Sequence, residues 1–399
     1  MRTSLSPVVG PRFFLFLHEP PRHALRPHAR AVQLAVFLFS RAVNHDCSVL
    51  LVLGMFVAGC APGASAPIAT VASSPKTIPV PTLTTLPTAS VTPNAPIAPG
   101  NAVRLREIAS WHSAEDSPFS HVRWSPDGRM LALVQQNRKA ILWEVPTWRE
   151  AYTLSGVASP VAFSPDSGLL AAGVENNAVK LWEVSTGKER RTLEGHSSAV
   201  RSVAFSPDGR LLFAGSTYGP QKLWQVATGQ EAGNLDYLVS GVVTSAAFSQ
   251  DGGLLALGTG SSRGQGVEIW DVVSLQRVRI LPKTMSDDIR TVAFSPDGRL
   301  VASGSSFGNV ELWQVASGRK LSTLSVAGSS IESVAFSPDG RLLALAASDG
   351  GIKLLDSASG RELHSLAENA PASGVAFSPD GRFLATTLDS TVKVWGLPP

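Results

Sequence analysis

The five residues Phe205-Ser206-Pro207-Asp208-Gly209 decide the fold, because seven variants of this phrase occur along the chain. Their first residues are spaced 39, 42, 43, 46, 42 and 41 apart, and a tryptophan or leucine follows each of them by 18 to 22 residues. The phrases begin at Trp124, Phe163, Phe205, Phe248, Phe294, Phe336 and Phe377, and the second markers are Trp143, Trp182, Trp224, Trp270, Trp313, Leu355 and Trp395. Self-similarity at this period indicates stacked supersecondary units.

One repeat can be interpreted strand by strand. Residues 199–205 alternate apolar and polar side chains, as a half-buried strand does. Residues 206–209 then predict a tight turn, in which proline fixes φ, aspartate bonds the local backbone and glycine accepts a positive φ. Residues 211–216 and 221–226 predict two more strands, and residues 189–193 show the fourth strand of the preceding repeat. Radial stacking covers both apolar faces of such sheets, so the sequence predicts an all-β, seven-bladed β-propeller.

The two ends of the repeat region predict how the ring closes. Four residues follow Trp395, so the last blade lacks a fourth strand of its own. Residues 106–111, Arg-Glu-Ile-Ala-Ser-Trp, match residues 361–366, Arg-Glu-Leu-His-Ser-Leu, which form the fourth strand of blade six. We therefore expect the N-terminal strand to pair into the last blade and close the ring.

The period near 40, the aromatic-Ser-Pro-Asp-Gly turn and the Leu-Trp strand resemble the WD-repeat family of β-propellers, over residues 101–399. The resemblance implies a structural role for the repeated tryptophans, Trp143, Trp182, Trp224, Trp270, Trp313 and Trp395. It also implies a structural hydrogen bond for His196, which lies in the Gly-His pair that blades of this family often carry. No repeat holds the family's complete polar network, so we expect rigidity to come from packing and turns.

The region before the repeats predicts a targeting signal followed by a flexible tether. The apolar run at residues 48–58 is too short to span a bilayer of ~30 Å but suits a signal-peptide core. It ends in Val57-Ala58-Gly59-Cys60, which resembles the lipobox of bacterial lipoproteins and implies lipidation of Cys60; a buried or free cysteine is the alternative. Residues 1–59 are then a leader. Its apolar run begins late for a secretory signal and follows Asp46, which favours a true translation start downstream of Met1.

Residues 60–100 differ sharply from the repeats in composition. After Cys60 they hold 9 Pro, 11 Ser or Thr and 8 Ala, with Lys76 the one charge. Such a segment buries too little apolar surface to offset its ordering entropy, and proline keeps it extended. We therefore predict a disordered tether that ends where the propeller begins, at residue 101.

Charge and motifs exclude several function classes. Of 34 Lys and Arg and 31 Asp and Glu, residues 1–100 hold seven and two, so the repeat region carries a net charge of −2 and does not favour nucleic acid. The two cysteines and the histidine spacing indicate neither a metal site nor a catalytic triad, and no cofactor motif occurs. The glycine-rich residues 258–266 are not followed by a helix, so they predict a hairpin insertion rather than a phosphate loop.

The candidate interaction residues lie in predicted loops at the rims of the ring. Arg263 lies in the hairpin insertion, and Asp287 and Asp288 form an acidic pair that we interpret as a solvated loop rather than an acid–base dyad or a calcium site. Trp148 occupies a turn position that is glycine at Gly187, Gly229, Gly318 and Gly360, which predicts an exposed contact for a partner; packing on Pro146 is the alternative.

Together these patterns predict a monomeric, non-catalytic scaffold for a protein or peptide partner, lipid-anchored in a bacterial cell envelope outside the cytoplasmic membrane. An extracytoplasmic enzyme, or a propeller that binds a small molecule or glycan in its central channel, is the first alternative. The predicted starts of the inner strands disfavour it, because they supply few carboxylates or imidazoles: Ser120, Ser159, Ser198, Val243, Ile289, Ser330 and Ala372. The second alternative is a cytoplasmic WD-repeat scaffold, if the leader is not a signal.

Overall fold

The computed structural model describes residues 95–398, except 236–240, 261–265, 283–286, 326–328 and 368–369. The chain divides into two units, Met1–Pro75 and Lys76–Pro399, and all described residues belong to the second. Cys60, Arg263 and nearly all of the predicted leader and tether therefore lie outside the described residues. Within the described part of the chain, no helix is long and apolar enough to cross a membrane.

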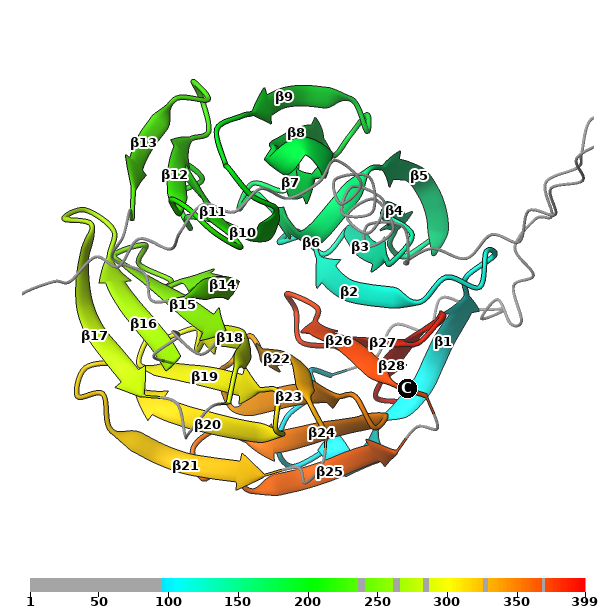
Figure 1. The fold of residues 1–399 in the computed structure, drawn as a ribbon. Coiled ribbons are helices and arrows are strands. Elements are labelled where there is room, and N and C mark those ends of the chain that lie inside the picture. The colour runs from blue at the N-terminus through cyan, green and yellow to red at the C-terminus, as the bar shows by residue number, and fades with distance from the viewer. Residues whose placement is uncertain are drawn as a thin grey trace, which may run out of the picture. The chain divides into compact units, whose positions relative to one another are not determined.

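The described residues form seven antiparallel sheets of four strands, arranged around one central axis (Figure 1). Blade 1 comprises β2 (Phe119–Trp124), β3 (Met130–Gln135), β4 (Lys139–Glu144) and β5 (Arg149–Ser155). Blade 2 comprises β6 (Val157–Phe163), β7 (Leu169–Val174), β8 (Val179–Glu183) and β9 (Glu189–Leu193). Blade 3 comprises β10 (Val200–Phe205), β11 (Leu211–Ser216), β12 (Lys222–Gln225) and β13 (Glu231–Asn234). Blade 4 comprises β14 (Val242–Phe248), β15 (Leu254–Gly260), β16 (Gly266–Asp271) and β17 (Gln276–Pro282).

The remaining three blades follow the same order. Blade 5 comprises β18 (Ile289–Phe294), β19 (Leu300–Ser305), β20 (Asn309–Gln314) and β21 (Lys320–Ser325). Blade 6 comprises β22 (Ile331–Phe336), β23 (Leu342–Ala347), β24 (Gly351–Asp356) and β25 (Glu362–Ala367). Blade 7 comprises β26 (Ala372–Phe377), β27 (Phe383–Leu388), β28 (Thr391–Gly396) and the N-terminal β1 (Arg106–His112). Two short 3-10 helices, η1 (Ala102–Arg104) and η2 (Glu175–Asn177), complete the described secondary structure. The predicted seven-bladed propeller is confirmed.

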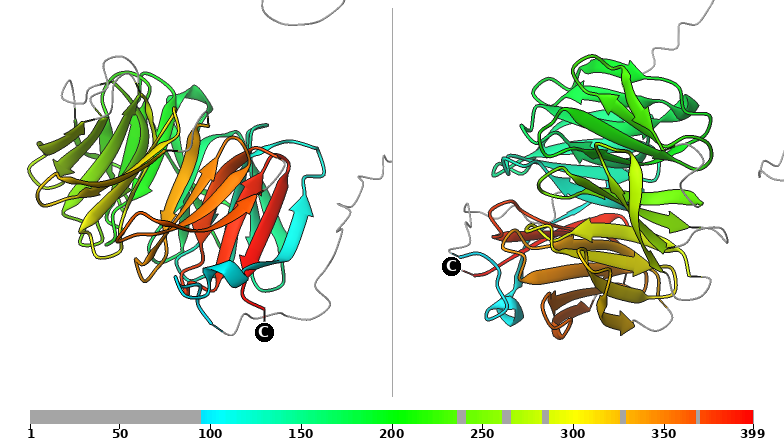
Figure 2. Two further views of the ribbon diagram at one scale, coloured as in Figure 1. Left: turned by 90° about the horizontal axis from the view of Figure 1, so that it is seen from below. Right: turned by 90° about the vertical axis from the view of Figure 1, so that its left-hand side faces the viewer.

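The ring is closed by strands from both ends of the chain. Strand β1 pairs antiparallel with β28, so that Arg106 lies opposite Gly396 and His112 opposite Thr391. The left view of Figure 2 shows the cyan β1 beside the red β28 at the edge of blade 7. The predicted closure is confirmed.

An ion pair between the third and fourth strands marks the same seam. Within the described residues, six blades join a cation and a carboxylate at equivalent positions of these strands, and blade 7 does so through Lys393 of β28 and Glu107 of β1, 3.2 Å apart. The other pairs are Lys180–Glu189, Lys222–Glu231, Glu268–Arg277, Glu311–Lys320 and Lys353–Glu362. In blades 4 and 5 the carboxylate is on the third strand and the cation on the fourth, the reverse of the other blades. The cation lies over the repeated tryptophan ring in these two blades, as it does in blades 3 and 7. The N-terminal strand therefore takes the place of a regular fourth strand.

The propeller begins earlier than residue 101. Ile97 is 2% exposed, and its backbone N–H donates to the carbonyl of Gly381 at 2.8 Å. With Ala102 and Leu105 it joins the apolar cluster of blades 6 and 7. Packing contacts of the propeller therefore begin at least four residues before residue 101.

Seven Ser-x-Asp turns join the first strand of each blade to the second. In each turn the serine hydroxyl donates to the aspartate carboxylate at 2.5–2.6 Å, and the carboxylate accepts the backbone N–H two residues later at 3.0–3.1 Å. The serine also accepts the N–H of the residue that opens the second strand. The serine hydrogen bond is the main cause that holds the pKa of Asp166, Asp208, Asp251 and Asp297 below the usual 3.8.

These turns predict loss of stability in acid. Because the pKa of the carboxylates is lower in the folded chain than in the unfolded chain, their contribution is fully present above about pH 4 and is lost as the pH falls through the folded value. The midpoint of thermal unfolding should therefore change little from pH 7 to about pH 5 and fall below pH 4. Ser206→Ala should lower the midpoint at pH 7 and differ less from the wild type at pH 3, as followed by circular dichroism. A difference that is constant with pH would contradict this origin.

Neighbouring blades meet where the turn after a third strand contacts the fourth strand of the preceding blade. Where the turn residue is glycine, with φ near +70°, the opposing side chain is large or polar: a Cβ on Gly187 would lie 2.9 Å from the ring of Tyr152, and one on Gly229 would lie 2.6 Å from Arg191. The same holds for Gly318 against Arg279 and for Gly360 against Ser322.

Two contacts reverse these sizes. Leu275 takes the turn position in blade 4 and faces Gly233, where a Cβ would lie 2.6 Å from the leucine. Trp148 takes it in blade 1, and Ala109 of β1 takes the fourth-strand position. The ring of Trp148 is half-buried and lies 5.0 Å from Trp111 and 6.1 Å from Trp124. The expectation of an exposed aromatic at Trp148 is therefore wrong, because the small Ala109 leaves room for the ring to pack inward at the seam.

A size exchange tests this contact. Ala109→Tyr should overpack the seam and lower the free energy of unfolding by about 1–3 kcal/mol. Trp148→Gly should cost about 3 kcal/mol by leaving a cavity. The double variant recreates the Tyr152–Gly187 pair, so its loss should be smaller than the sum of the two, as measured by chemical denaturation. Additive losses would show that the two side chains do not share one space.

Candidate interaction site at the channel mouth

The innermost strand of each blade carries a β-bulge near its start. The pairing register shifts between Val200 and Ser202 in blade 3 and between Ile289 and Thr291 in blade 5, and the other blades shift at the equivalent place. A bulged residue lacks a partner on the second strand, so its side chain is redirected out of the ladder. These residues are Ser120, Arg201, Thr244, Arg290, Glu332 and Ser373, and blade 2 has a longer irregularity between Val157 and Val161.

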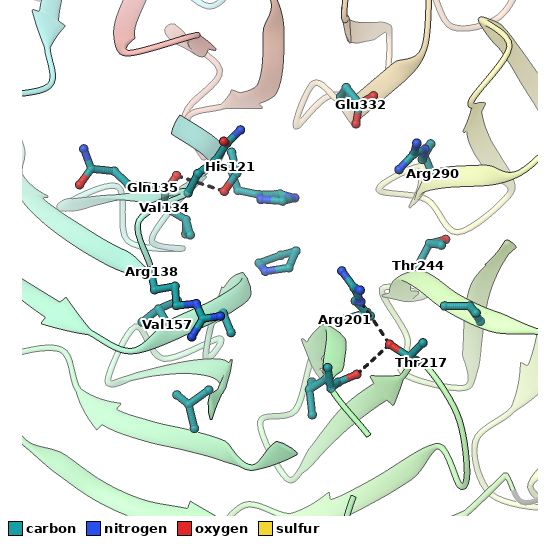
Figure 3. Close-up of a pocket in the computed structure, with 18 residues that line it drawn as sticks. His121, Val134, Gln135, Arg138, Val157, Arg201, Thr217, Thr244, Arg290 and Glu332 are labelled. Carbon is teal, nitrogen blue, oxygen red and sulfur yellow. Dashed lines mark hydrogen bonds between the residues drawn. The ribbon is translucent and has the colours of Figure 1, made fainter. Parts of the chain in front are cut away.

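The bulged side chains surround the mouth of the central channel. A cavity of about 740 Å³ is lined by the bulge residues of blades 1, 3, 4, 5 and 6 and by Pro160 of blade 2. Figure 3 shows Arg201, Thr244, Arg290 and Glu332 around this opening. The cavity is in the size range of small-ligand sites and can also take a short peptide segment.

Sequence reasoning missed these charged residues. It took the channel lining from the predicted starts of the inner strands, which supplied mostly serine and small apolar side chains. The bulge moves the inward-facing position to the residue four before each aromatic marker, which is Arg201, Arg290 and Glu332 in blades 3, 5 and 6. Alignment of the repeats at the marker phrase alone could have found them.

The mouth carries more positive than negative charge. Arg201 donates from Nε to the Thr217 hydroxyl at 3.2 Å and has no carboxylate partner among the described residues. Arg290 and Glu332 form no ion pair within the described ranges, whereas Arg138 pairs with Glu175. Burial and, after it, the positive charge of Arg123 lower the pKa of His121 to about 4, so the imidazole is neutral at pH 7.

Arg123 is the exception in an otherwise uniform ring. It lies directly before the marker aromatic of blade 1, and the same position holds alanine in every other blade: Ala162, Ala204, Ala247, Ala293, Ala335 and Ala376. The alternation of β2 puts Arg123 on the same face as His121, which lines the cavity. Arg123 is solvent-exposed. The protein atoms around it nevertheless desolvate its guanidinium in part and lower the pKa of that group.

Two exposed aromatic residues stand at the rim of the same mouth. Tyr218 and Phe307 are 72% and 66% exposed and occupy equivalent positions in the hairpins between the second and third strands of blades 3 and 5. The residue seven positions before the marker aromatic of each of these blades accepts a hydrogen bond from the backbone of the hairpin. Ser198 accepts the N–H of Tyr218 at 2.7 Å, and Asp287 accepts the N–H of Phe307 at 3.0 Å.

Asp287 therefore supports a loop and does not lie in a solvated pair. It is 4% exposed and also accepts hydrogen bonds from the Ser306 hydroxyl at 3.0 Å and the Asn309 amide at 3.1 Å. The expectation of a solvated loop is wrong here, because this carboxylate replaces the serine of blade 3 as the acceptor for the hairpin backbone. Asp288 is half-buried, and its N–H donates to Ser306.

The predicted structural residues lie inside the blades. Each repeated tryptophan is on a third strand, and those of blades 4, 5 and 7 donate to a carboxylate or hydroxyl of their own sheet. His196 packs near Trp224, at 6.4 Å between ring centroids, but neither of its nitrogens has a hydrogen-bond partner of regular geometry. Burial and the charge of Lys222 lower the pKa of His196 to about 4. An interaction with the backbone of Pro220 opposes this lowering, and the structural hydrogen bond of His196 stays a prediction.

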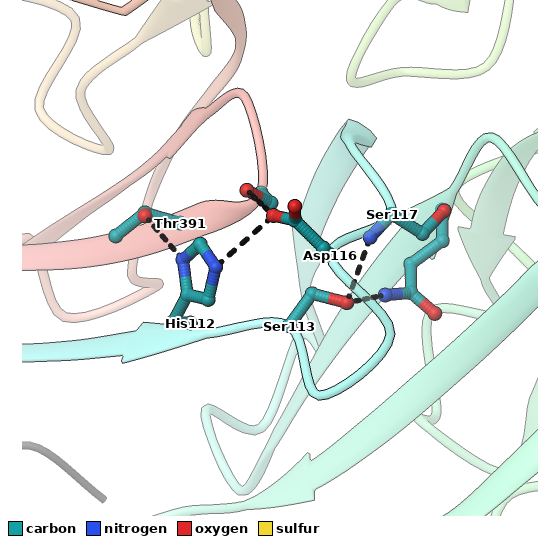
Figure 4. Close-up of polar contacts among 7 residues, drawn as sticks. His112, Ser113, Asp116, Ser117 and Thr391 are labelled. Carbon is teal, nitrogen blue, oxygen red and sulfur yellow. Dashed lines mark hydrogen bonds and ion pairs between the residues drawn. The ribbon is translucent and has the colours of Figure 1, made fainter. Parts of the chain in front are cut away.

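A second polar cluster, with residue types that occur in catalytic triads, lies at the seam. His112 bonds Thr391 at 3.1 Å and Asp116 at 3.2 Å, which gives the order hydroxyl, imidazole, carboxylate (Figure 4). His112 and Thr391 are, however, a cross-strand pair of β1 and β28, and Asp116 also accepts the Ser390 hydroxyl at 3.0 Å. None of these residues lines the cavity, so the cluster ties the two chain ends together. Across the described residues no group of three or more His, Cys, Asp or Glu could hold a metal.

Comparison with protein families agrees with the blades. The model of the WD domain, G-beta repeat, matches residues 152–183, 187–219 and 360–396. The chain contains WD40 repeats. Models of the anaphase-promoting complex subunit 4 WD40 domain and of eukaryotic translation initiation factor eIF2A match residues 325–377 and 214–349. No curated protein matches the chain. WD40 propellers commonly mediate interactions between proteins.

Removal of the Asp287 carboxylate tests how this WD40 propeller presents Phe307. Asp287→Ala leaves three donors without their acceptor and should lower the free energy of unfolding by about 1–3 kcal/mol. Hydrogen exchange of the Phe307 N–H should become faster. The matched control, Asn309→Ala, removes one of the three contacts and should leave that N–H protected. Unchanged exchange in Asp287→Ala would contradict the supporting role.

Proposed function

We propose that this WD40 protein is a non-catalytic scaffold that binds a protein partner at the channel mouth, through the rim hairpins of blades 3 and 5. The observation that carries the proposal is the combination of exposed aromatic side chains and inward-facing charges on a closed ring. Tyr218 and Phe307 supply apolar contact area, and Arg201 and Arg290 supply directional donors beside them. Aromatic and arginine side chains dominate the energetics of protein interfaces.

The hairpins are held in place, which favours binding. The backbone of each rim aromatic is fixed by a side chain of the neighbouring loop, Ser198 or Asp287. A partner therefore does not have to order these segments when it binds, and the entropy cost of association is reduced.

We further propose that the propeller acts as a monomer in a bacterial cell envelope, anchored by lipid on Cys60 outside the cytoplasmic membrane. The support comes from the sequence, namely the apolar run that ends in Val57-Ala58-Gly59-Cys60 and the proline-rich residues after it. A single acyl modification holds a protein only weakly, whereas two or more chains give stable anchoring.

A small-molecule or glycan ligand in the channel, with or without catalysis, is the second candidate. The cavity of about 740 Å³ and its unpaired Arg290 and Glu332 favour it, within the described part of the chain. A cytoplasmic scaffold is the third, and membrane fractionation separates it from the others.

Crosslinking in intact cells tests the scaffold. The full chain should give reproducible protein crosslinks at the rim hairpins of blades 3 and 5, identified by mass spectrometry. Cys60→Ala should release the chain from the membrane fraction and remove these crosslinks, because the partner is reached only at the membrane. Crosslinks that persist in released chain would reject the anchored location. A folded, membrane-bound chain without protein crosslinks would favour the small-ligand alternative.

A further inference from the structure

The central channel concentrates positive charge in a molecule that is otherwise slightly acidic. The repeat region carries a net charge of −2, since 34 Lys and Arg and 31 Asp and Glu divide as seven and two in residues 1–100 and the rest beyond. Arg201, Arg290 and Glu332 line the cavity without an ion pair to a described residue, Arg138 there is paired with Glu175, and Arg123 lies on the face of β2 that carries His121. The histidine beside them, His121, is neutral at pH 7.

Packing between the blades does not account for the arginine at position 123. Arginine at position 123 replaces an alanine that serves six other blades, so the ring of blades does not need it for packing. Among the described residues it makes no hydrogen bond or ion pair, and the surrounding protein disfavours its charged form. Arg123, Arg201 and Arg290 are all solvent-exposed, and none of them forms an ion pair with a described residue, so their guanidinium groups are free to bind an anionic partner.

The geometry separates two levels of contact. Arg201 and Arg290 project from bulges on blades 3 and 5 at the mouth (Figure 3). Arg123 lies two residues further along β2 than His121. The exposed Tyr218 and Phe307 stand on the same two blades as the mouth arginines. A ligand that uses all of them needs several anionic groups along an extended chain, with apolar groups near one end.

We propose that the channel binds an acidic peptide segment of a protein partner, whose carboxylates pair with Arg201, Arg290 and Arg123 and whose flanking apolar residues pack on Tyr218 and Phe307. Clusters of arginine recognise acidic segments through bidentate hydrogen bonds to carboxylates. Glu332 can accept a backbone N–H of the bound segment. The proposal rests on the proposed scaffold function and specifies the chemistry of its partner.

Binding of a labelled peptide to the full chain tests it. Fluorescein-labelled hexaglutamate should bind the purified chain, as measured by fluorescence anisotropy, and rising salt should weaken the complex. Arg123→Ala and Arg201→Gln should each raise the dissociation constant about tenfold, since a charge-assisted hydrogen bond contributes on that order. Arg123→Ala introduces the residue of the other six blades, so the fold should tolerate it; thermal unfolding verifies this.

The matched control is Arg210→Gln, which removes the same charge from an exposed turn. It should leave the affinity unchanged, and an equal loss in this variant would overturn the proposal in favour of non-specific attraction. Succinate is the second probe: if it binds as tightly as hexaglutamate, the occupant is a small acid and the peptide assignment fails.

A competition experiment separates this inference from the scaffold function. Excess hexaglutamate should suppress the protein crosslinks at the rim of the full chain. Crosslinks that remain undiminished would overturn the channel assignment and leave the scaffold intact. Absence of hexaglutamate binding would also overturn it, whether or not crosslinks are found.

Discussion

The pairing of β1 with β28 is the constraint on which the rest of the structure depends. A ring of sheets has no open face only if its last blade is complete, and here the fourth strand of that blade comes from the other end of the chain. Closure lets every sheet cover its neighbours on both sides, which accounts for the buried second and third strands. It also fixes the seven inner strands around one channel, so that side chains far apart in sequence reach one opening.

The seam needed a different solution from the other blade contacts. Elsewhere a glycine turn at positive φ receives a large side chain from the preceding blade, as Gly187 receives Tyr152. At the seam the fourth strand offers Ala109, and Trp148 fills the space with a ring that contacts Trp111, Trp124 and Phe383. The aromatic cluster therefore joins β1, β27 and blade 1, which are the elements that closure must hold together.

Much of the architecture could be predicted from sequence, because it follows from local chemistry repeated seven times. The Ser-Pro-Asp-Gly turn needs nothing beyond its own residues, and the match of residues 106–111 with residues 361–366 located the seam. The errors at Trp148 and Asp287 share a physical cause. Each depends on a contact with a residue tens of positions away or across a blade, Ala109 in one case and the hairpin of Phe307 in the other. The residue type at position 148 or 287 does not indicate which distant residue it contacts.

The channel residues escaped prediction for a subtler reason, and the reason bears on function. The predicted strand starts lay at unequal distances from the marker phrase, so they reached the bulge residue at Ser120 but missed it in blades 3, 5 and 6. Once the bulges are aligned, the repeats agree almost everywhere that packing demands agreement and differ where the channel begins. Val203, Val292 and Val334 are interchangeable, whereas the bulge beside them holds Arg201, Arg290 or Glu332. Packing leaves these positions free, and it is there that the channel mouth carries charges without an ion pair among the described residues, available to a ligand.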